Sequence, residues 1–239
     1  MSPKTDFAEE SDFIIAAAER DFMRWWNRSD GMPAARRERE MQDVMVGLTD
    51  HYGEIAGQSA GDYIHREWMD YGGDYRRLPY PTVAPTAAPT AVLESTGWAM
   101  QTRQGGLASA ALPGVRVRVR ALEALVRHAM QPARDTVAVG TTQAKTRFAR
   151  VAEAGACGFC LMLASRGGVY LDSGKALSND AARFHDNCRC SAVQVQDDSE
   201  LPQSSHELFK QWADYASNEP GQPSLEGWSA WLYDQRKNG

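Results

Sequence analysis

The sequence predicts an α+β protein, with a mainly α-helical N-terminal region and a small α+β module at residues 145–196 that a metal holds together. Three observations predict this class. Apolar residues recur at intervals of three and four over most of the chain, which is the period of an amphipathic helix. Two short segments near the cysteines alternate as strands do. The cysteines themselves are gathered in one part of the chain, as in small metal-stapled modules.

The N-terminal helical region covers residues 1–71 and is expected to begin with a mobile tail at residues 1–10. Ser11 can cap the first helix, whose apolar residues continue at helical spacing to Trp26. The polar residues before Pro33 break this helix, and a proline suits the first turn of the second one. The rest of the region is helical in character, although two glycines weaken the pattern.

The segment that follows, residues 72–90, is rich in Pro, Gly and Thr. Each residue before a proline is pushed toward an extended conformation. The composition therefore predicts a linker, or an extended arm that lies along a neighbour, and it shows no sign of a repeat fold.

A further helical region is expected at residues 91–144. Within it, Val and Arg alternate at residues 115–120, which alone would predict a strand. The apolar spacing that continues to Val126 instead fits a helix, with basic residues on another face. This basic face could contact a partner through Arg116, Arg120 and Arg127.

The C-terminal helical tail, residues 197–239, is expected to hold two short amphipathic helices, at residues 206–217 and 225–237. The second places Trp228 and Trp231 on one side. A helix this short buries little surface by itself. These two indoles are therefore further candidates for docking on a partner.

Composition excludes some classes of function. Of the 239 residues, 43 % are hydrophobic and 24 % are charged, which is ordinary for a globular protein. No apolar stretch approaches the roughly 20 residues that cross a bilayer, and the acidic N-terminus does not resemble a signal peptide. A membrane partner is therefore not expected. The net charge of −5 argues against a dedicated nucleic-acid binder.

The cysteine pattern is the most specific feature of the chain. It consists of C-x2-C at residues 157–160, followed by H-x2-C-x-C at residues 185–190. Without a signal peptide, clustered cysteines favour metal binding over structural disulfides. Thiolates with imidazole form the tetrahedral ligand set that zinc prefers. Spacing does not decide which four of the five candidate ligands bind: Cys157, Cys160, His185, Cys188 and Cys190.

Three other interpretations of the cysteines stay open: a redox site, a pair of disulfides, and ordinary buried cysteines that are close in sequence by coincidence. A thioredoxin-type site would use the first cysteine pair at a helix start, but it leaves the second cysteine segment unexplained. A catalytic zinc would need an open coordination position, and no HExxH motif supplies a general base. The zinc is therefore expected to be structural, and no enzymatic activity is expected.

The zinc-stapled module at residues 145–196 is expected to be built from three strands and one short helix. The strands are expected at residues 146–151, 169–171 and 191–196, and the helix at residues 160–166. These pieces are too small to fold by burial alone, so the metal would connect them.

The sequence CGFCLMLASRGGVY, followed by FHDNCRC, is similar to the C-terminal motif of the Mu gpF-like minor capsid (head morphogenesis) proteins of tailed phages, in particular those of actinobacterial phages and prophages. The likeness covers residues 133–195. The resemblance implies a virion component inside the capsid, near the portal vertex, that takes part in head assembly or genome packaging after synthesis in the host cytoplasm. It implies the portal and other head proteins as partners, packaged DNA as a further candidate, and no small-molecule substrate.

Two rival functions remain: a capsid maturation protease or another head-maturation enzyme, and a zinc-dependent DNA-binding module. No Ser/His/Asp constellation stands out in the sequence, and the loop serines are expected to act as caps. The histidines outside the cysteine cluster are expected at the surface or in caps: His51, His65, His128 and His206.

Overall fold

The computed structural model describes residues 3–100, 113–152, 156–169, 190–219 and 221–238. These residues form seven α-helices and a two-stranded sheet, which confirms a mostly helical α+β protein. They divide into two compact units, with the boundary between Thr136 and Val137. None of the described helices is both long and apolar enough to cross a membrane.

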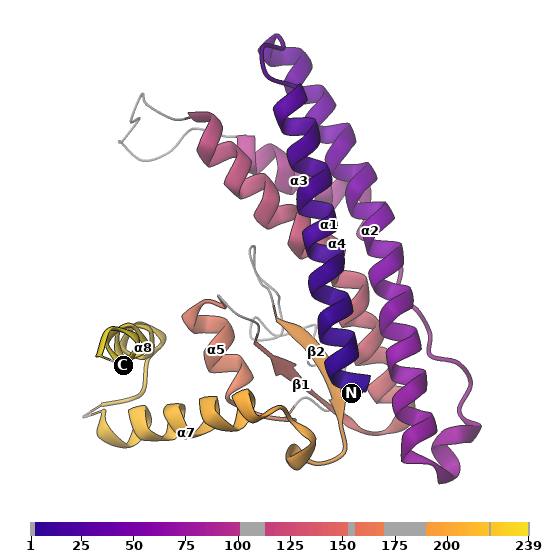
Figure 1. Ribbon diagram of the computed structural model, residues 1–239, viewed down its shortest axis with the longest axis vertical. Helices are drawn as coiled ribbons and strands as arrows, with labels where there is room; N and C mark the ends of the chain where they lie inside the picture. Colours follow the sequence, from indigo (N-terminus) through magenta and orange to yellow (C-terminus); the bar gives the residue numbers. More distant parts are fainter. Residues whose placement is uncertain (1–2, 101–112, 153–155, 170–189, 220, 239) are drawn as a thin grey trace. The chain divides into compact units, whose positions relative to one another are not determined.

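The first unit is built on a helical hairpin. Helix α1 (Pro3–Arg28) and helix α2 (Ala34–Tyr71) run side by side in opposite directions, joined by the short break that the sequence predicts (Figure 1). The facing stripes of the two helices supply the core, which includes Phe22, Met45 and Trp68 with no exposed surface. The second helix is continuous over 38 residues, glycines included.

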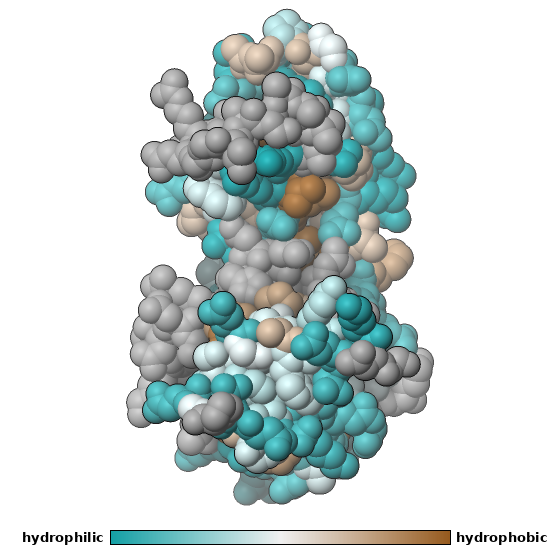
Figure 2. Space-filling view, turned by 90° about the vertical axis from the view of Figure 1, so that its left-hand side faces the viewer, coloured by the Kyte–Doolittle hydropathy of each residue, from teal (hydrophilic) through white to brown (hydrophobic). Residues whose placement is uncertain are grey.

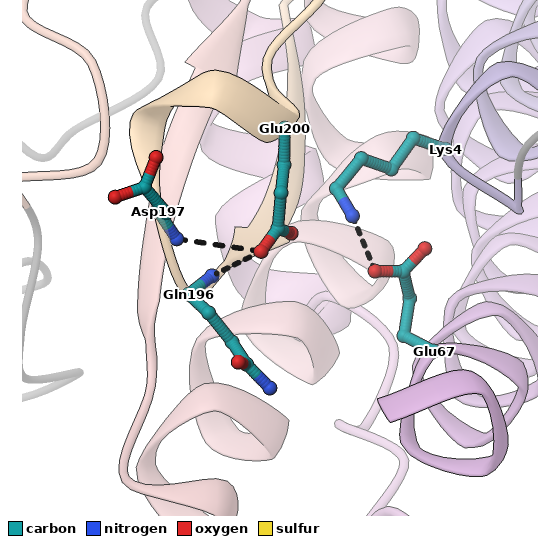
Figure 3. Close-up of polar contacts among 5 residues, drawn as sticks. All are labelled: Lys4, Glu67, Gln196, Asp197 and Glu200. Carbon is teal, nitrogen blue, oxygen red and sulfur yellow. Dashed lines mark hydrogen bonds and ion pairs between the residues drawn. The ribbon is translucent and has the colours of Figure 1, made fainter. Parts of the chain in front are cut away.

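The expected mobile tail at residues 1–10 is wrong, because α1 already begins at Pro3. Two contacts with α2 hold its first turns. Phe7 stacks on Tyr63 with ring centroids 4.6 Å apart, and the Lys4 ammonium pairs with the Glu67 carboxylate (Figure 3). Both partners lie more than fifty residues away in the sequence, so local pattern does not show them.

The Pro-rich segment is an arm that lies along α2 of its own chain. A 3₁₀ helix, η1 (Gly73–Arg77), leads into it, and residues 78–88 form neither helix nor strand. The arm is seated on glycines of α2. A Cβ added at Gly57 would lie 3.0 Å from Val83 Cγ1, and one at Gly61 would lie 2.9 Å from the Tyr80 hydroxyl. The glycines that weaken the helical pattern therefore let the arm approach the helix closely.

Helix α3 (Pro89–Met100) and helix α4 (Pro113–Ala144) follow the arm. The alternating Val-Arg segment at residues 115–120 belongs to α4, which confirms the helix rather than the strand. This helix continues through Pro132, whose ring carbons lie beside Gly53 and Gly57, and it contributes residues to both units.

The second unit contains the sheet. Helix α4 ends at Ala144, Lys145 follows with the left-handed φ of 54°, and the chain turns directly into strand β1 (Arg147–Val151). This strand pairs antiparallel with strand β2 (Ser191–Val195), and both strands lie within the ranges that the sequence predicts. A third strand was expected at residues 169–171; Val169 lies in no strand, and its other two residues lie outside the described part.

A short 3₁₀ helix, η3 (Asp198–Glu200), follows β2. Glu200 Oε1 accepts hydrogen bonds from the backbone N–H groups of Gln196 and Asp197, at 3.2 and 3.4 Å (Figure 3). The Asp197 side chain accepts a hydrogen bond from the backbone N–H of Ser199 at 2.8 Å. Because the hydrogen bonds from Ser199 favour the charged carboxylate of Asp197, they lower the pKa of that group.

Two C-terminal helices, α7 (Gln203–Asn218) and α8 (Leu225–Asn238), confirm the helical pair expected in the tail. They pack against helix α5 (Gly158–Ala164), which in turn packs on β1. An aromatic cluster joins the two helices and consists of Trp212, Tyr215, Trp228 and Trp231, with ring centroids 5.2 to 6.3 Å apart. The surface drawn in Figure 2 is mostly teal and white over the described residues, with brown in small areas.

Candidate metal centre

The two cysteine segments lead to the same end of the sheet. Strand register pairs Val151 with Ser191. Cys157 follows Val151 by six residues, and Cys190 immediately precedes Ser191. The pairing of β1 with β2 therefore directs the chain that leads to Cys157 and the chain that leaves Cys190 to the same end of the ladder, although the described cysteines are not grouped there as a metal site.

Helix α5 presents the first cysteine pair. Cys157 is its N-cap residue, with the extended angles φ −73° and ψ 164°, and its carbonyl accepts the N–H of Leu161 at 3.0 Å. Cys160 lies in the first turn and is 1 % exposed, whereas Cys157 is exposed. The pair therefore points one sulfur to the interior and leaves one near the surface, an arrangement that an ion at the end of the helix could bridge.

The second segment is described only at Cys190, which is 2 % exposed. His185 and Cys188 lie outside the described residues. Within the described part of the chain, no three His, Cys, Asp or Glu side chains are grouped closely enough to hold an ion. The three described thiols fit the donor chemistry of zinc, and a complete ligand set needs His185 or Cys188.

The end of α5 is fixed by a double-glycine turn. Gly167 has a φ of 68°, and the N–H of Gly168 donates to Asp198 Oδ1 at 2.9 Å. A Cβ at Gly168 would lie 2.5 Å from Val195 Cγ2. The two glycines that follow α5 therefore also allow close packing against β2 and η3.

Helix α8 holds the start of α5. The indole Nε1–H of Trp228 donates to the carbonyl of Gly158 at 3.0 Å, and Trp228 has no exposed surface. The backbone approaches closely here, because a Cβ at Gly158 would lie 2.3 Å from Ser229 Oγ. Trp228 is thus a core residue that positions the first cysteine pair, while Trp231 stacks on it and is partly exposed.

Replacing Trp228 with phenylalanine is expected to loosen this first pair. An aromatic ring is kept, but the partly buried carbonyl of Gly158 loses its hydrogen-bond donor, which costs about 1 kcal/mol. Cys157 and Cys160 should therefore react faster with a thiol reagent after zinc is chelated. A Trp231→Phe variant, which removes an indole from the same cluster, is the control; equal rates in the two variants would contradict the positioning role of Trp228.

The three arginines of the predicted basic face of α4 do not all lie at the surface. Arg116 is exposed, and the Arg120 guanidinium lies 4.7 Å from the ring centroid of Trp98, which is itself 49 % exposed. Arg127 instead turns toward α3, where its Nη2 donates to Ser95 Oγ at 2.5 Å. The first two arginines remain at the surface, and Arg127 is part of an internal network.

His128 completes that network and is a buried residue, so its expected surface or capping position is wrong. It is 8 % exposed, and its Nε2 lies 2.9 Å from both Ser95 Oγ and Arg127 Nη2. Burial first, and the Arg127 charge second, lower the pKa of His128 to about 4. Because arginine can only donate, Nε2 accepts and the ring is neutral.

Stability should fall in acid because of this histidine. Between its ordinary pKa of about 6.5 and its folded pKa of about 4, the unfolded chain binds a proton and the folded chain does not. The free energy of unfolding should therefore decrease by up to about 3 kcal/mol as the pH falls through this window. A His128→Gln variant should lose much of this dependence in urea denaturation, whereas a control His51→Gln variant, at an exposed position, should keep it.

A family model described as "VG15 protein" matches residues 3–215, which is most of the chain. Matched residues include the helical hairpin, the arm, both strands and the described cysteines, whereas α8 lies beyond them. No curated protein and no solved structure matches the chain.

Proposed function

Because the chain belongs to the VG15 protein family, which is a phage-type family of virion genes, we propose that it is a minor capsid protein acting in head morphogenesis, with a structural zinc ion in its second unit. It would work inside the head, near the portal vertex, by binding the portal and other head proteins. The resemblance of the cysteine segments to those of Mu gpF-like proteins supports this finer assignment.

The register of the sheet is the observation that best supports the proposed zinc site. Two cysteine segments 28 residues apart, from Cys160 to Cys188, flank strands that pair with each other. Within the described residues, the sheet has two strands of five residues each, and helix α5, which contains Cys160, has seven residues. Elements of this size seldom fold without a metal or a disulfide, so a structural ion explains why they are held together.

Two measurements test the proposal. Elemental mass spectrometry of the purified chain should find about one zinc ion per chain, as for a single tetrahedral site. Quantitative peptide analysis of purified phage particles should find the chain in the virion, and immobilised portal protein should retain it. A chain without zinc would remove the structural-ion assignment, and a chain absent from particles and unable to bind the portal would remove the head assignment.

A maturation hydrolase is the second candidate, because the structure brings together a hydroxyl and an imidazole, Ser95 and His128, that sequence reasoning missed. Three features weigh against it. Ser95 Oγ lies 3.0 Å from the Ala91 carbonyl, its natural acceptor within the helix. Arg127 occupies the same Nε2 that would have to take the serine proton. An imidazole with a pKa of about 4 is also a weak general base at neutral pH.

A serine-directed fluorophosphonate probe separates the two candidates. A structural protein should remain unlabelled at Ser95, and a Ser95→Ala variant should still assemble into heads. Labelling of Ser95 that disappears in a His128→Gln variant would establish the hydrolase instead.

A further inference from the structure

A groove on the helical hairpin of the first unit carries an apolar floor and an acidic rim. It encloses about 560 Å³ between α1 and α2. Phe13, 70 % exposed, and Ile55, 41 % exposed, supply apolar surface that the chain leaves open to solvent. The acidic side chains that line it are Asp6, Glu9 and Glu10.

The rim is only partly neutralised within the described residues, because one of its three carboxylates is paired. Glu10 contacts Arg66 at 3.6 Å and accepts a hydrogen bond from Ser59. Glu9 is exposed, and the buried Oδ1 of Asp6 has no hydrogen-bond donor among the residues that the structure describes. An occupant of the groove should therefore bring an apolar side chain for Phe13 together with a cationic donor for the rim.

The chain carries a surface with these properties on α4. Arg116, Val119 and Arg120 follow one another at positions i, i+3 and i+4 and so share one helix face. Val119 is 44 % exposed, and the stacking of Arg120 on Trp98 orders its guanidinium beside an exposed indole. The groove carries the complementary residues: Asp6, Glu9 and Phe13 lie at positions i, i+3 and i+7 of α1 and so share one face, which is acidic and apolar.

We propose that the α4 face of a second copy of this chain, formed by Arg116, Val119 and Arg120, docks in the α1–α2 groove. Phe13 and Val119 are both exposed in a single chain, so neither surface covers the other there. A contact of groove with groove would place the acidic rims together, so the groove of one copy meets the α4 face of the other instead. The C-terminal face of Tyr233 and Lys237 is a poorer occupant, because Asp234 adjoins it.

Reciprocal charge reversal tests this contact. Sedimentation velocity of the zinc-loaded chain should show association that grows with concentration and weakens at high salt. Glu9→Arg and Arg116→Glu should each weaken self-association by about tenfold or more, since each places like charges in contact. An equimolar mixture of the two variants should recover association, because each then meets a partner of opposite charge. Phe13→Ala should weaken it without changing the charge.

A matched control is Glu38→Arg, which reverses an exposed acidic residue elsewhere on α2. It should associate as the wild-type chain does. The proposal is overturned if the wild-type chain is monomeric at every concentration, if Glu38→Arg weakens association as much as Glu9→Arg does, or if the mixture fails to recover. Each variant should keep its zinc content and helical circular dichroism, so the outcome is independent of the proposed metal.

Discussion

Replacing Cys160 with serine is expected to remove zinc from the protein and to unfold its second unit. Cys160 is the buried member of the first cysteine pair, and a serine hydroxyl is a poor zinc ligand. Structural zinc sites contribute about 10 to 16 kcal/mol at neutral pH, which is comparable to or larger than the roughly 5 to 15 kcal/mol that stabilises a whole domain. The free energy lost with one ligand should therefore exceed the stability that the small sheet provides without zinc.

Zinc analysis and limited proteolysis together measure this effect. The zinc content should fall from about one ion per chain to near zero, as expected when a ligand of a single site is lost. Protease should then cut residues after Val137, while the α1–α2 hairpin stays protected. Chelation of the wild-type chain should reproduce the pattern.

Met162→Leu is the matched control, because it changes a partly exposed residue of the same short helix that cannot replace a thiolate. It should keep its zinc and its protease resistance. A Cys160→Ser chain that remains as resistant as this control would show that the second unit is stable without the metal.

Replacing Lys4 with methionine is expected to lower the free energy of unfolding of the first unit by about 3 kcal/mol, as for other buried pairs that lose one partner. The side chains of Lys4 and Glu67 are only 11 % and 4 % exposed, and they form an ion pair between the start of α1 and the end of α2 (Figure 3). Without the ammonium, the carboxylate of Glu67 stays buried and loses its counter-charge. Lys4 also lies 5.8 Å from the Tyr71 ring centroid, so its loss removes a cation–π contact.

Urea denaturation followed by circular dichroism checks this value, and an exposed pair supplies the comparison. Arg36 and Glu40 lie 2.8 Å apart on α2 with side chains 63 % and 33 % exposed. Arg36→Met should cost at most about 1 kcal/mol. The double variant Lys4→Met with Glu67→Leu should recover most of the lost stability, because no unpaired charge remains. Equal losses in the free energy of unfolding for Lys4→Met and Arg36→Met would contradict the prediction that the buried pair contributes more than the exposed one.

Local pattern was sufficient to predict most of the secondary structure. The break before Pro33, the helix over the alternating Val-Arg segment and both strands around the cysteines follow from apolar period and from glycine and proline. Each of these signals depends on residues within a few positions of one another. A helical period in the sequence is therefore enough to find a helix, even where it does not show what the helix contacts.

The sequence predicted the chemistry of the candidate site, but not the long-range contacts that position its residues. The cysteine spacing identifies the donors, since thiolates two residues apart can reach one ion. It does not show that Trp228 holds the backbone of Gly158, because the donor and acceptor are 70 residues apart. Nor does it show the Ser95–His128 contact, which joins residues 33 positions apart on two helices.

The sequence by itself determined most of the helices and both described strands, the break before Pro33, and which side chains could bind a metal. The tertiary structure alone decided that α1 begins at Pro3, that the Pro-rich arm lies on the glycines of α2, and that His128 is buried. The physical reason is the range of the interactions. Period and propensity act between neighbours in the chain, whereas burial, ion pairing and close backbone approach depend on residues that only folding brings together.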